Sequence, residues 1–235
     1  ENWQDYDVVG ISIVGISQII PGLTLARMIK EKYPHLHITL GGPIFSVNAG
    51  QLIGHPEFFD DFCHSVVTFE GEEPMHRLLS ALKAGNSLST VPNLLHLDGR
   101  EVVQNKERVE LRFEELPHPD FDGLPMDKYL SPYPILPVLQ SRGCYWGKCT
   151  FCTHSFVYGH RYGKQKTQAM VDELEKLMKK YNTKYFTFSD EAVSPHSLND
   201  VSEEMIERGV EIRSLALLKF EKVMDEELFG KMKQA

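Results

Sequence analysis

The chain contains 235 residues, 42% of them hydrophobic and 25% charged, and it carries a formal net charge of −8 at pH 7. This composition is typical of a globular protein of one or two domains, and it excludes the strongly basic footprint of a nucleic-acid-binding protein. No apolar run is long enough to span a membrane, and no signal peptide is recognisable. The chain has four cysteines and nothing that indicates an oxidising compartment, so we expect a cytoplasmic protein.

The first elements predict a βαβ unit. Residues 7–14 form a nearly continuous apolar run, as in a buried parallel strand. Residues 23–33 have helical periodicity, and residues 37–40 predict a second strand that ends at Gly41 and Gly42. The apolar face of the helix would consist of Leu25, Met28 and Ile29. Because open α/β sheets bind ligands at the carboxyl ends of their strands, and glycines permit close backbone approach, the glycine pair marks a candidate binding site.

The following elements complete a first α/β domain, which we place at residues 1–113. A strand is predicted at residues 66–69, and a helix around residues 75–84. Between them lie Glu70, Gly71 and Glu72. Glu72 has a simple alternative role, because acidic residues stabilise helix N-termini. The dipeptide Asp98-Gly99 then separates two apolar segments, which predicts a β-hairpin that closes the domain.

The second half of the chain predicts alternating strands and helices. Six prolines fall between residues 117 and 137, and this density blocks both helix and central strand, so we interpret residues 114–136 as a linker. The second domain then covers residues 137–235. Its expected strands are residues 138–141, 185–188 and 211–218, and its expected helices are residues 167–181, 198–208 and a segment from Asp225.

Three cysteines lie close together at the start of this second domain. Cys144, Cys149 and Cys152 span nine residues of a chain with four cysteines, which favours a metal site. Three thiolates fit a cubane iron–sulfur cluster that keeps one iron open for another ligand. A zinc site remains an alternative, with His154 or His160 as the fourth ligand, whereas a disulfide would leave one cysteine over. The fourth cysteine, Cys63, is expected to be a small buried hydrophobic residue.

At these cysteines the sequence resembles a known family. Arg142-Gly143-Cys144 followed by Cys149-Thr150-Phe151-Cys152 is similar to the cluster motif of radical S-adenosylmethionine enzymes. The resemblance implies that Cys144, Cys149 and Cys152 hold a [4Fe–4S] cluster whose fourth iron is chelated by S-adenosylmethionine. It places Phe151 near the adenine. Four residues separate the first two cysteines where the family usually has three, and longer gaps occur in some cobalamin-dependent branches.

The resemblance also implies roles for residues outside the cysteine motif. Ser189, Asp190 and Glu191 follow a predicted strand, where relatives place acidic residues near the amino group of S-adenosylmethionine. Ser12-x-Val14 and the later Gly41-Gly42 resemble part of the cobalamin-binding module, and the Gly-Glu pair after residue 69 is typical of cobalamin-binding radical enzymes. The implied cobalamin contacts are Ser12, Ser17, Gly41, Gly42, Glu70, Gly71 and Glu72.

The expected architecture is therefore α/β, with a Rossmann-like (flavodoxin-like) cobalamin-binding domain followed by a partial (β/α) radical S-adenosylmethionine barrel. The resemblance implies a fragment that lacks the first strand of the cobalamin domain and about half of the barrel. The open half barrel would expose strand edges and favour self-association.

The implied reaction is methylation of an unactivated carbon, started by a 5′-deoxyadenosyl radical and completed by methylcobalamin. An external electron donor would be required. The substrate, a small molecule or a peptide, and the catalytic residues are not indicated. Three alternatives remain: a cyclase or rearrangement enzyme with the same cofactors, an inactive cofactor-binding fragment, and a zinc-stapled structural protein.

Overall fold

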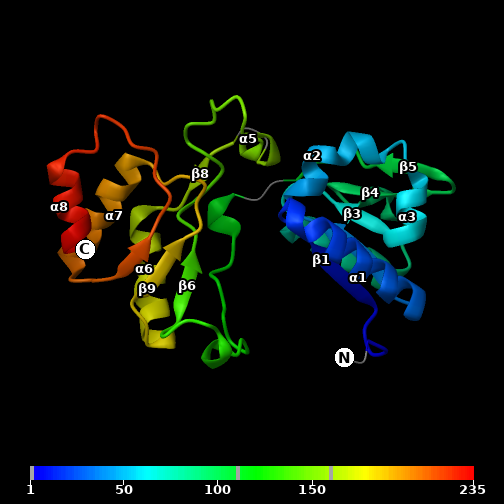
Figure 1. Ribbon diagram of the computed structural model, residues 1–235, viewed down its shortest axis with the longest axis horizontal. Helices are drawn as coiled ribbons and strands as arrows, with labels where there is room; N and C mark the ends of the chain where they lie inside the picture. Colours follow the sequence, from blue (N-terminus) through cyan, green and yellow to red (C-terminus); the bar gives the residue numbers. More distant parts are fainter. Residues whose placement is uncertain (1–2, 110–111, 159–160) are drawn as a thin grey trace. The chain divides into compact units, whose positions relative to one another are not determined.

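A computed structural model describes residues 3–109, 112–158 and 161–235 of the chain (Figure 1). It divides into two compact units, Glu1–Leu111 (unit 1) and Arg112–Ala235 (unit 2). In the described part of the chain, none of the helices combines the length and the hydropathy needed to cross a membrane.

The sheet of unit 1 contains parallel strands followed by a hairpin. Strands β1 (Val8–Ser12), β2 (His37–Gly41) and β3 (Ser65–Val67) are parallel neighbours, and β4 (Leu94–Asp98) and β5 (Glu101–Gln104) extend the sheet antiparallel. The strand order is β1-β2-β3-β4-β5. The parallel strands and the closing hairpin are thus as predicted, whereas the order among the described strands contains no reversal, and the flavodoxin-like arrangement stays a prediction.

The helices of unit 1 differ more from expectation. They are α1 (Ile19–Lys32), α2 (Pro43–Leu52), α3 (Pro56–Phe62) and α4 (Glu72–Ala84), with short 3₁₀ turns η1 (Ile16–Gln18) and η2 (Leu88–Thr90). The sequence analysis missed α2 and α3 altogether. Both begin with a proline at the first helical position, where the missing N–H costs nothing. This signal was present in the sequence.

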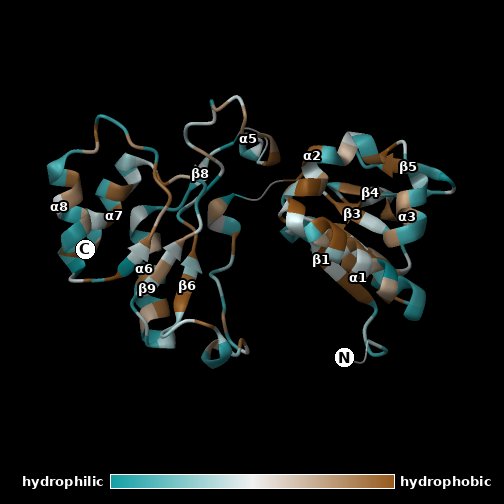
Figure 2. Ribbon diagram, viewed as in Figure 1, coloured by the Kyte–Doolittle hydropathy of each residue, from teal (hydrophilic) through white to brown (hydrophobic). Residues whose placement is uncertain are grey.

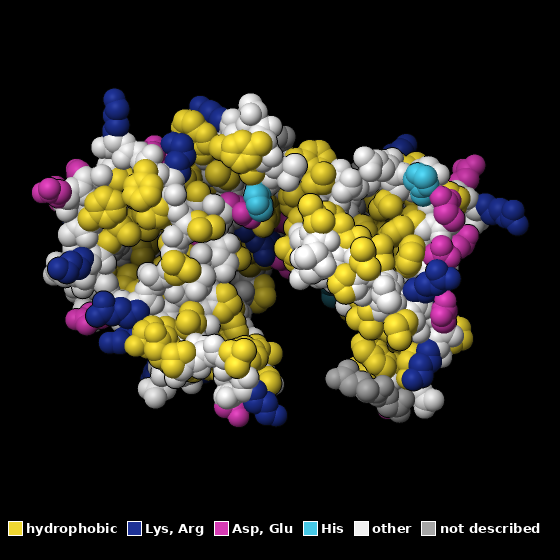
Figure 3. Space-filling view, in the orientation of Figure 1, with side chains coloured by type: hydrophobic (Ala, Val, Ile, Leu, Met, Phe, Trp, Pro, Cys, Tyr) yellow, Lys and Arg dark blue, Asp and Glu magenta, His cyan; other side chains and the backbone are white. Residues whose placement is uncertain are grey.

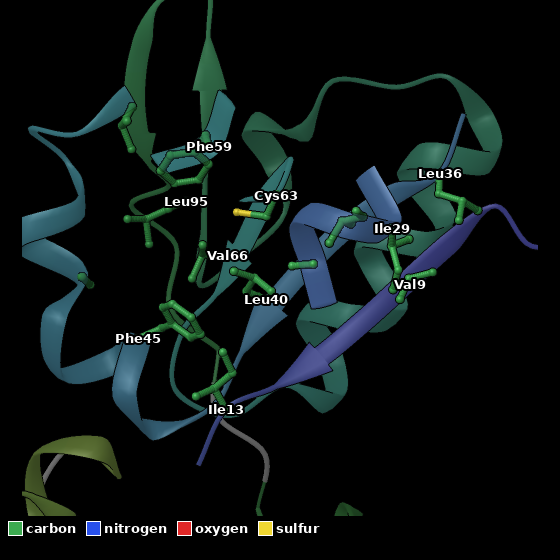
Figure 4. Close-up of a cluster of buried hydrophobic side chains, with 14 residues drawn as sticks. Val9, Ile13, Ile29, Leu36, Leu40, Phe45, Phe59, Cys63, Val66 and Leu95 are labelled. Carbon is green, nitrogen blue, oxygen red and sulfur yellow. The ribbon is translucent and has the colours of Figure 1, made fainter. Parts of the chain in front are cut away.

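The main core of unit 1 lies around β2 (Figure 4). Cys63 is 1% exposed there, among side chains such as Leu40 and Phe59, and burial raises its thiol pKa to about 12. The expectation of a buried, inert cysteine is confirmed.

The predicted apolar face of α1 is wrong in part. Leu25 and Met28 are 46% and 61% exposed, and the buried residues of the helix are Ala26 and Ile29. Figure 3 shows hydrophobic side chains gathered on the surface of this part of unit 1. Val14, Ile16 and Ile20 are also exposed, by 61%, 81% and 78%.

Unit 2 is built on a three-stranded parallel sheet. Its strands are β6 (Ile135–Val138), β9 (Tyr185–Phe188) and β10 (Arg213–Leu215), in the order β10-β9-β6, and a two-stranded ribbon pairs β7 (Ser141–Arg142) with β8 (Gly163–Lys164). Hydrophobic residues run along β6 in Figure 2. The expected strand at residues 138–141 is therefore placed too late, because β6 starts within the proline-rich segment.

The three longer helices of unit 2 follow the predicted alternation, whereas the short helix after the cysteines was not predicted. The helices are α5 (His154–Val157), α6 (Thr167–Tyr181), α7 (Pro195–Arg208) and α8 (Glu226–Gln234), with 3₁₀ turns η3 (Phe113–Glu115) and η4 (Met126–Lys128). Ser194 caps α7 through the backbone N–H of Ser197, and Gly209 ends it with φ +67°. The N-cap serine and the C-terminal glycine are both recognisable helix signals in the sequence.

The proline-rich segment before β6 is tied to unit 2. The Asp120 carboxylate accepts a hydrogen bond from Lys180 Nζ at 2.9 Å. The ring of Tyr133 stacks on Tyr185 with a centroid distance of 3.6 Å. These contacts make residues 112–134 part of the second unit.

Candidate functional site

The three clustered cysteines lie on a loop between β7 and α5, which we call the cluster loop (residues 143–153). All are free thiols; Cys144 is half-buried, and Cys149 and Cys152 are exposed. Cys152 donates its backbone N–H to Cys149 O at 3.1 Å, which forms a tight turn. Gly143 has φ +79°, and a Cβ there would collide with the Arg161 carbonyl. The entry to the loop therefore requires glycine.

The donor set fits the expected cluster better than a single ion. Among the described residues, no group of three His, Cys, Asp or Glu side chains is arranged to hold one metal ion. A cubane cluster instead takes each thiolate on a different iron, so free thiols spread along a loop are suitable ligands. For the zinc alternative, His154 is paired with Glu191 through Nδ1 and Oε2 at 3.0 Å, and His160 lies outside the described residues.

Asp190 joins the end of β9 to the chain that leads into the cluster loop. It is 1% exposed. Its carboxylate accepts the backbone N–H groups of Gln140 at 3.0 Å and Ser141 at 2.6 Å, and the Ser141 hydroxyl at 2.5 Å. Burial raises the pKa of Asp190, and these hydrogen bonds act in the opposite direction. The structure thus uses this side chain to fix the backbone before the loop.

Glu191 and Ser189 occupy the same strand end. Ser189 is exposed and donates its backbone N–H to Val138 O at 2.8 Å. Glu191 is half-buried, and this burial raises its pKa, while His154 and Tyr158 favour the charged form. The carboxylate of Glu191 thereby reaches α5, directly after the cysteines. Phe151, on the loop itself, is 89% exposed.

The segment that follows β10 contacts the cluster loop as well. Tyr145 donates its hydroxyl to Glu221 Oε1 at 2.6 Å. Lys219 Nζ lies 3.8 Å from the centroid of the Trp146 ring and 3.3 Å from Glu221 Oε1. These contacts were not predicted, because residues far apart in sequence provide them. The carboxyl ends of β6, β9 and β10 therefore meet at one site.

In unit 1 the expected cobalamin residues lie at the carboxyl ends of β1, β2 and β3. Ser12 ends β1 and is in register with Gly41, which ends β2. Ser17 lies in η1 after β1, and both serines are exposed. Glu70 follows β3. Gly71 is the N-cap residue of α4 and Glu72 is its first residue, so Glu72 also lies in the first turn of a helix, as the alternative interpretation expected.

The two glycines after β2 have different roles. Gly42 has φ +108°, and a Cβ there would collide with the Ile13 carbonyl. Gly41 has more space, with Val67 O 3.6 Å from a Cβ position. Gly42 is therefore required by the fold itself, whereas the described neighbours of residue 41 leave room for a side-chain methyl group. The small residues Ser12, Gly41 and Gly71 fit a site that a large cofactor must approach closely.

The loop that contains Glu70 is held by residues that the sequence analysis missed. Phe69 has φ +61°, which is unusual for a bulky side chain. Its backbone N–H is bound by Ser46 Oγ of α2 at 2.7 Å, and Asn93 Nδ2 donates to Glu70 O at 3.3 Å. The guanidinium of Arg108 lies 3.7 Å from the centroid of the Phe69 ring. Ser46 was missed because helix α2 was not predicted. Asn93 and Arg108 were missed because only the tertiary fold brings them to this loop.

Comparisons with known proteins add to this geometry. No family model matches the chain. An uncharacterized methyltransferase of Pyrococcus horikoshii is 28% identical over 88% of this chain and 45% of its own length. An anaerobic magnesium-protoporphyrin IX monomethyl ester cyclase of Cereibacter sphaeroides is 27% identical over 84% of this chain and 33% of its own length.

Two solved structures share the fold. The cobalamin-dependent S-adenosylmethionine radical enzyme OxsB, with aqua-cobalamin and S-adenosylmethionine bound, aligns with a TM-score of 0.68 at 22% identity, over 88% of this chain and 30% of its own. The radical S-adenosylmethionine methyltransferase TsrM of Kitasatospora setae aligns with a TM-score of 0.70 at 19% identity, over 97% and 46%. This chain has the fold of cobalamin-dependent radical S-adenosylmethionine enzymes. The resemblance found in the sequence is confirmed.

The alignments cover most of this chain but less than half of the length of each relative. The chain spans 45% of the methyltransferase and 33% of the cyclase. Both units lie within the matched region, since the alignment with TsrM covers 97% of the chain. The likeness therefore supports the α/β architecture with parallel sheets, and it leaves the activity of the whole protein to be proposed.

Proposed function

We propose that this chain is the cofactor-binding part of a radical S-adenosylmethionine enzyme that uses a [4Fe–4S] cluster and cobalamin to methylate an unactivated carbon. The observation that carries the proposal is the position of three free thiols on the loop after β6 and β7. Glu191, at the carboxyl end of the neighbouring parallel strand β9, pairs with His154, two residues after Cys152. Active sites of parallel β/α folds lie at this end of the strands.

The candidate site residues of unit 2 each have a defined task in this proposal. Cys144, Cys149 and Cys152 would ligate the cluster, which with S-adenosylmethionine supplies one-electron chemistry and hydrogen abstraction, while cobalamin supplies methyl transfer. Glu191 and Ser189 would bind the amino group of S-adenosylmethionine, since a carboxylate and a hydroxyl both accept hydrogen bonds from an ammonium. Asp190 supports this arrangement by fixing the backbone of Gln140 and Ser141. The exposed ring of Phe151 offers an apolar surface for the adenine.

In unit 1 the proposed task is to hold the corrinoid. The hydroxyls of Ser12 and Ser17 are exposed beside Gly41, where the backbone can be approached closely. Glu70 and Gly71 would contact the cofactor from the end of β3, and Gly42 and Glu72 support the two loops. Ser46 and Asn93 hold the loop that contains Glu70 through hydrogen bonds to the Phe69 N–H and the Glu70 carbonyl.

The proposal is tested by anaerobic reconstitution with iron, sulfide and hydroxocobalamin, followed by desalting and an ultraviolet–visible spectrum. We expect a broad iron–sulfur absorption that bleaches with dithionite, together with retained corrinoid bands. Cys149→Ala and Cys152→Ala should remove the iron–sulfur absorption and leave the corrinoid bands. Cys63→Ala is the matched control, because this buried thiol lies in the other unit. Stoichiometric zinc without sulfide would reject the cluster and favour the structural-metal alternative.

A second candidate reaction uses the same cofactors. Two relatives are named as anaerobic magnesium-protoporphyrin IX monomethyl ester cyclases, at 27% and 25% identity, so cyclisation is the alternative outcome. Mass analysis of the product separates the two, because methylation adds one carbon and cyclisation adds none. The substrate, the electron donor and a cytoplasmic location remain expectations. If the cofactors bind but the full-length protein alone is active, the chain is a binding fragment.

A further inference from the structure

The cluster loop carries a feature that the proposed cofactor chemistry does not explain. Its first two cysteines are separated by Tyr145, Trp146, Gly147 and Lys148. Gly143 and Gly147 both have positive φ, +79° and +58°. A loop with two left-handed glycines is poorly restrained by its own backbone, because glycine has the largest conformational freedom. Besides the Cys149–Cys152 turn, the spacer needs side-chain contacts to fix its conformation.

Both aromatic side chains of this spacer contact residues of one segment, 219–221, while Lys148 of the spacer itself lies farther from the Trp146 ring, at 5.1 Å. Tyr145 donates to Glu221 at 2.6 Å, and the Lys219 ammonium lies 3.8 Å from the centroid of the Trp146 ring. Lys219 and Glu221 are themselves paired at 3.3 Å. A charge-assisted hydrogen bond and a cation–π contact thus act together on adjacent residues.

The contacts are partly shielded from solvent. The side chains of Lys219 and Glu221 are 35% and 27% exposed, and Trp146 is 37% exposed. The Tyr145 ring also meets the ring of Tyr162 at a centroid distance of 6.2 Å. Partial burial reduces the screening that makes fully exposed ion pairs weak.

We propose that Lys219 and Glu221 form a latch: they are positioning residues that hold the spacer between Cys144 and Cys149 from the chain segment after β10. This inference rests on the proposed cluster site, and it adds a dependence of that site on the third βα unit. Any ligand or chain movement that displaces residues 219–221 would release the cysteines. The latch would also keep the Lys219 ammonium against the spacer between these two cysteines.

The first test needs no cofactor. Hydrogen exchange of peptides that cover residues 143–149 is measured in the metal-free chain. Lys219→Met and Glu221→Gln should raise exchange in these peptides several-fold, and Lys219→Arg should restore protection, since a guanidinium also packs on an indole. Lys222→Met is the matched control, because it removes the same charge from an exposed neighbour. Equal exchange in Lys219→Met and Lys222→Met would overturn the latch.

A double-mutant cycle tests the hydrogen bond. Tyr145→Phe removes the donor and Glu221→Ala removes the acceptor, so each should increase exchange. The double variant should not exceed the larger single effect, since both substitutions remove the same hydrogen bond. Fully additive effects would contradict the contact. These substitutions alter partly exposed side chains, so the fold of unit 2 should persist, and exchange in β9 peptides checks it.

Tryptophan fluorescence gives an independent signal. The chain has two tryptophans, so Trp3→Phe leaves Trp146 as the single probe. Lys219→Met should shift its emission to the red as the indole becomes more solvated, while Lys222→Met should not. No difference between the two would again reject the latch.

The reconstituted protein reports on the cluster itself. Loss of a nearby positive charge disfavours the reduced, more negative cluster, so Lys219→Met should lower its midpoint potential more than Lys222→Met does, and Lys219→Arg should not. An equal lowering would overturn the electrostatic part of the latch. If the wild-type chain binds no cluster at all, the proposed function fails, while the exchange and fluorescence results still decide the latch.

Discussion

At the scale of single residues, the two glycines after β2 separate a requirement of the fold from a candidate requirement of binding. Gly42 has φ +108°, and a Cβ on this residue would collide with the Ile13 carbonyl. A Cβ on Gly41 would lie 3.6 Å from Val67 O, which is an ordinary van der Waals contact. We expect Gly42→Ala to destabilise unit 1 by about 3 kcal/mol, from backbone strain and the clash together. Urea unfolding followed in unit 1 measures this loss.

Gly41→Ala is the matched comparison for corrinoid binding. Its stability should stay near that of the wild type, since the added methyl finds room. If Gly41 makes space for cobalamin, the variant should retain less corrinoid after desalting. Normal corrinoid retention by a folded Gly41→Ala protein would show that the cofactor lies elsewhere.

Two neighbouring histidines give unit 1 a dependence on pH. Burial, assisted by His64 and Lys30, lowers the pKa of His37 from 6.5 to about 4. Burial also lowers the pKa of His64, whose Nδ1 accepts a hydrogen bond from the backbone N–H of Ile38 at 2.9 Å. Both rings are therefore neutral in the folded protein near pH 7, and protonation of His64 Nδ1 would leave the Ile38 N–H without its acceptor.

The direction of the pH effect on stability follows from the lowered pKa of His37. Between about pH 4 and 6.5 the unfolded chain binds more protons at His37 than the folded chain does, so the stability contributed by the neutral ring is complete above pH 6.5. It should be lost as the pH falls toward 4, by on the order of 2 kcal/mol. Urea unfolding of His37→Gln between pH 7 and 4 should show a flatter profile than the wild type. His35→Gln, an exposed neighbour, should keep the wild-type slope, and identical profiles for all three proteins would refute the assignment.

At the scale of elements, periodicity and terminal signals predicted most of the fold. The βα units of the second half and the hairpin at Gly99 were found, because their patterns are local. Helix α2 was missed because Gly42 and Pro43 were interpreted only as the end of a strand, and α3 was missed because Pro56 was not interpreted as a helix start. Strand β6 was placed late because proline density argued against a strand, and its edge position removes that objection.

The same scale explains what could be predicted of the site. The cysteine spacing and the acidic residues after β9 are local patterns, so both were found. The partners that hold them are not local. Asp190 binds Ser141, and Lys219 packs on Trp146, across 49 and 73 positions of sequence. One sequence contains no record of such pairs, and a folded structure is needed to see them.

Strand β10 supports the expectation of self-association. It pairs with β9 on one side only and forms an edge of the described sheet. Leu215 is 66% exposed and Leu217 is 62% exposed. An open apolar edge favours pairing with another chain, and a lysine on the edge prevents it. We expect light scattering to show concentration-dependent association of this chain, reduced by Leu215→Lys.

The control for this edge is Leu79→Lys, because Leu79 is 45% exposed on helix α4 and belongs to no strand. It should leave the association unchanged. A wild-type chain that stays monomeric over the whole concentration range would contradict the prediction, and an equal effect of both lysines would assign the association to general surface hydropathy.

At the scale of the whole molecule, each unit has its own hydrophobic core. Leu40 belongs to the core around β2, and Phe186 belongs to the core around β9; both are 1% exposed. The exposed Cys149 and Cys152 contribute to neither. Removing the cluster thiols should therefore cost no core packing, which is why those variants can isolate cofactor binding from folding.

Separate cores predict separate unfolding. Leu40→Ala and Phe186→Ala should each cost about 3 kcal/mol, from lost burial and the cavity left behind, and each should shift only the unit that contains it. Hydrogen exchange measured peptide by peptide in increasing urea distinguishes the two units. Bound hydroxocobalamin should then protect unit 1 alone, since a ligand stabilises the cooperative unit that binds it. A common shift of all peptides in either variant would instead make the chain one cooperative unit, and corrinoid binding would then be expected to stabilise the cluster loop as well.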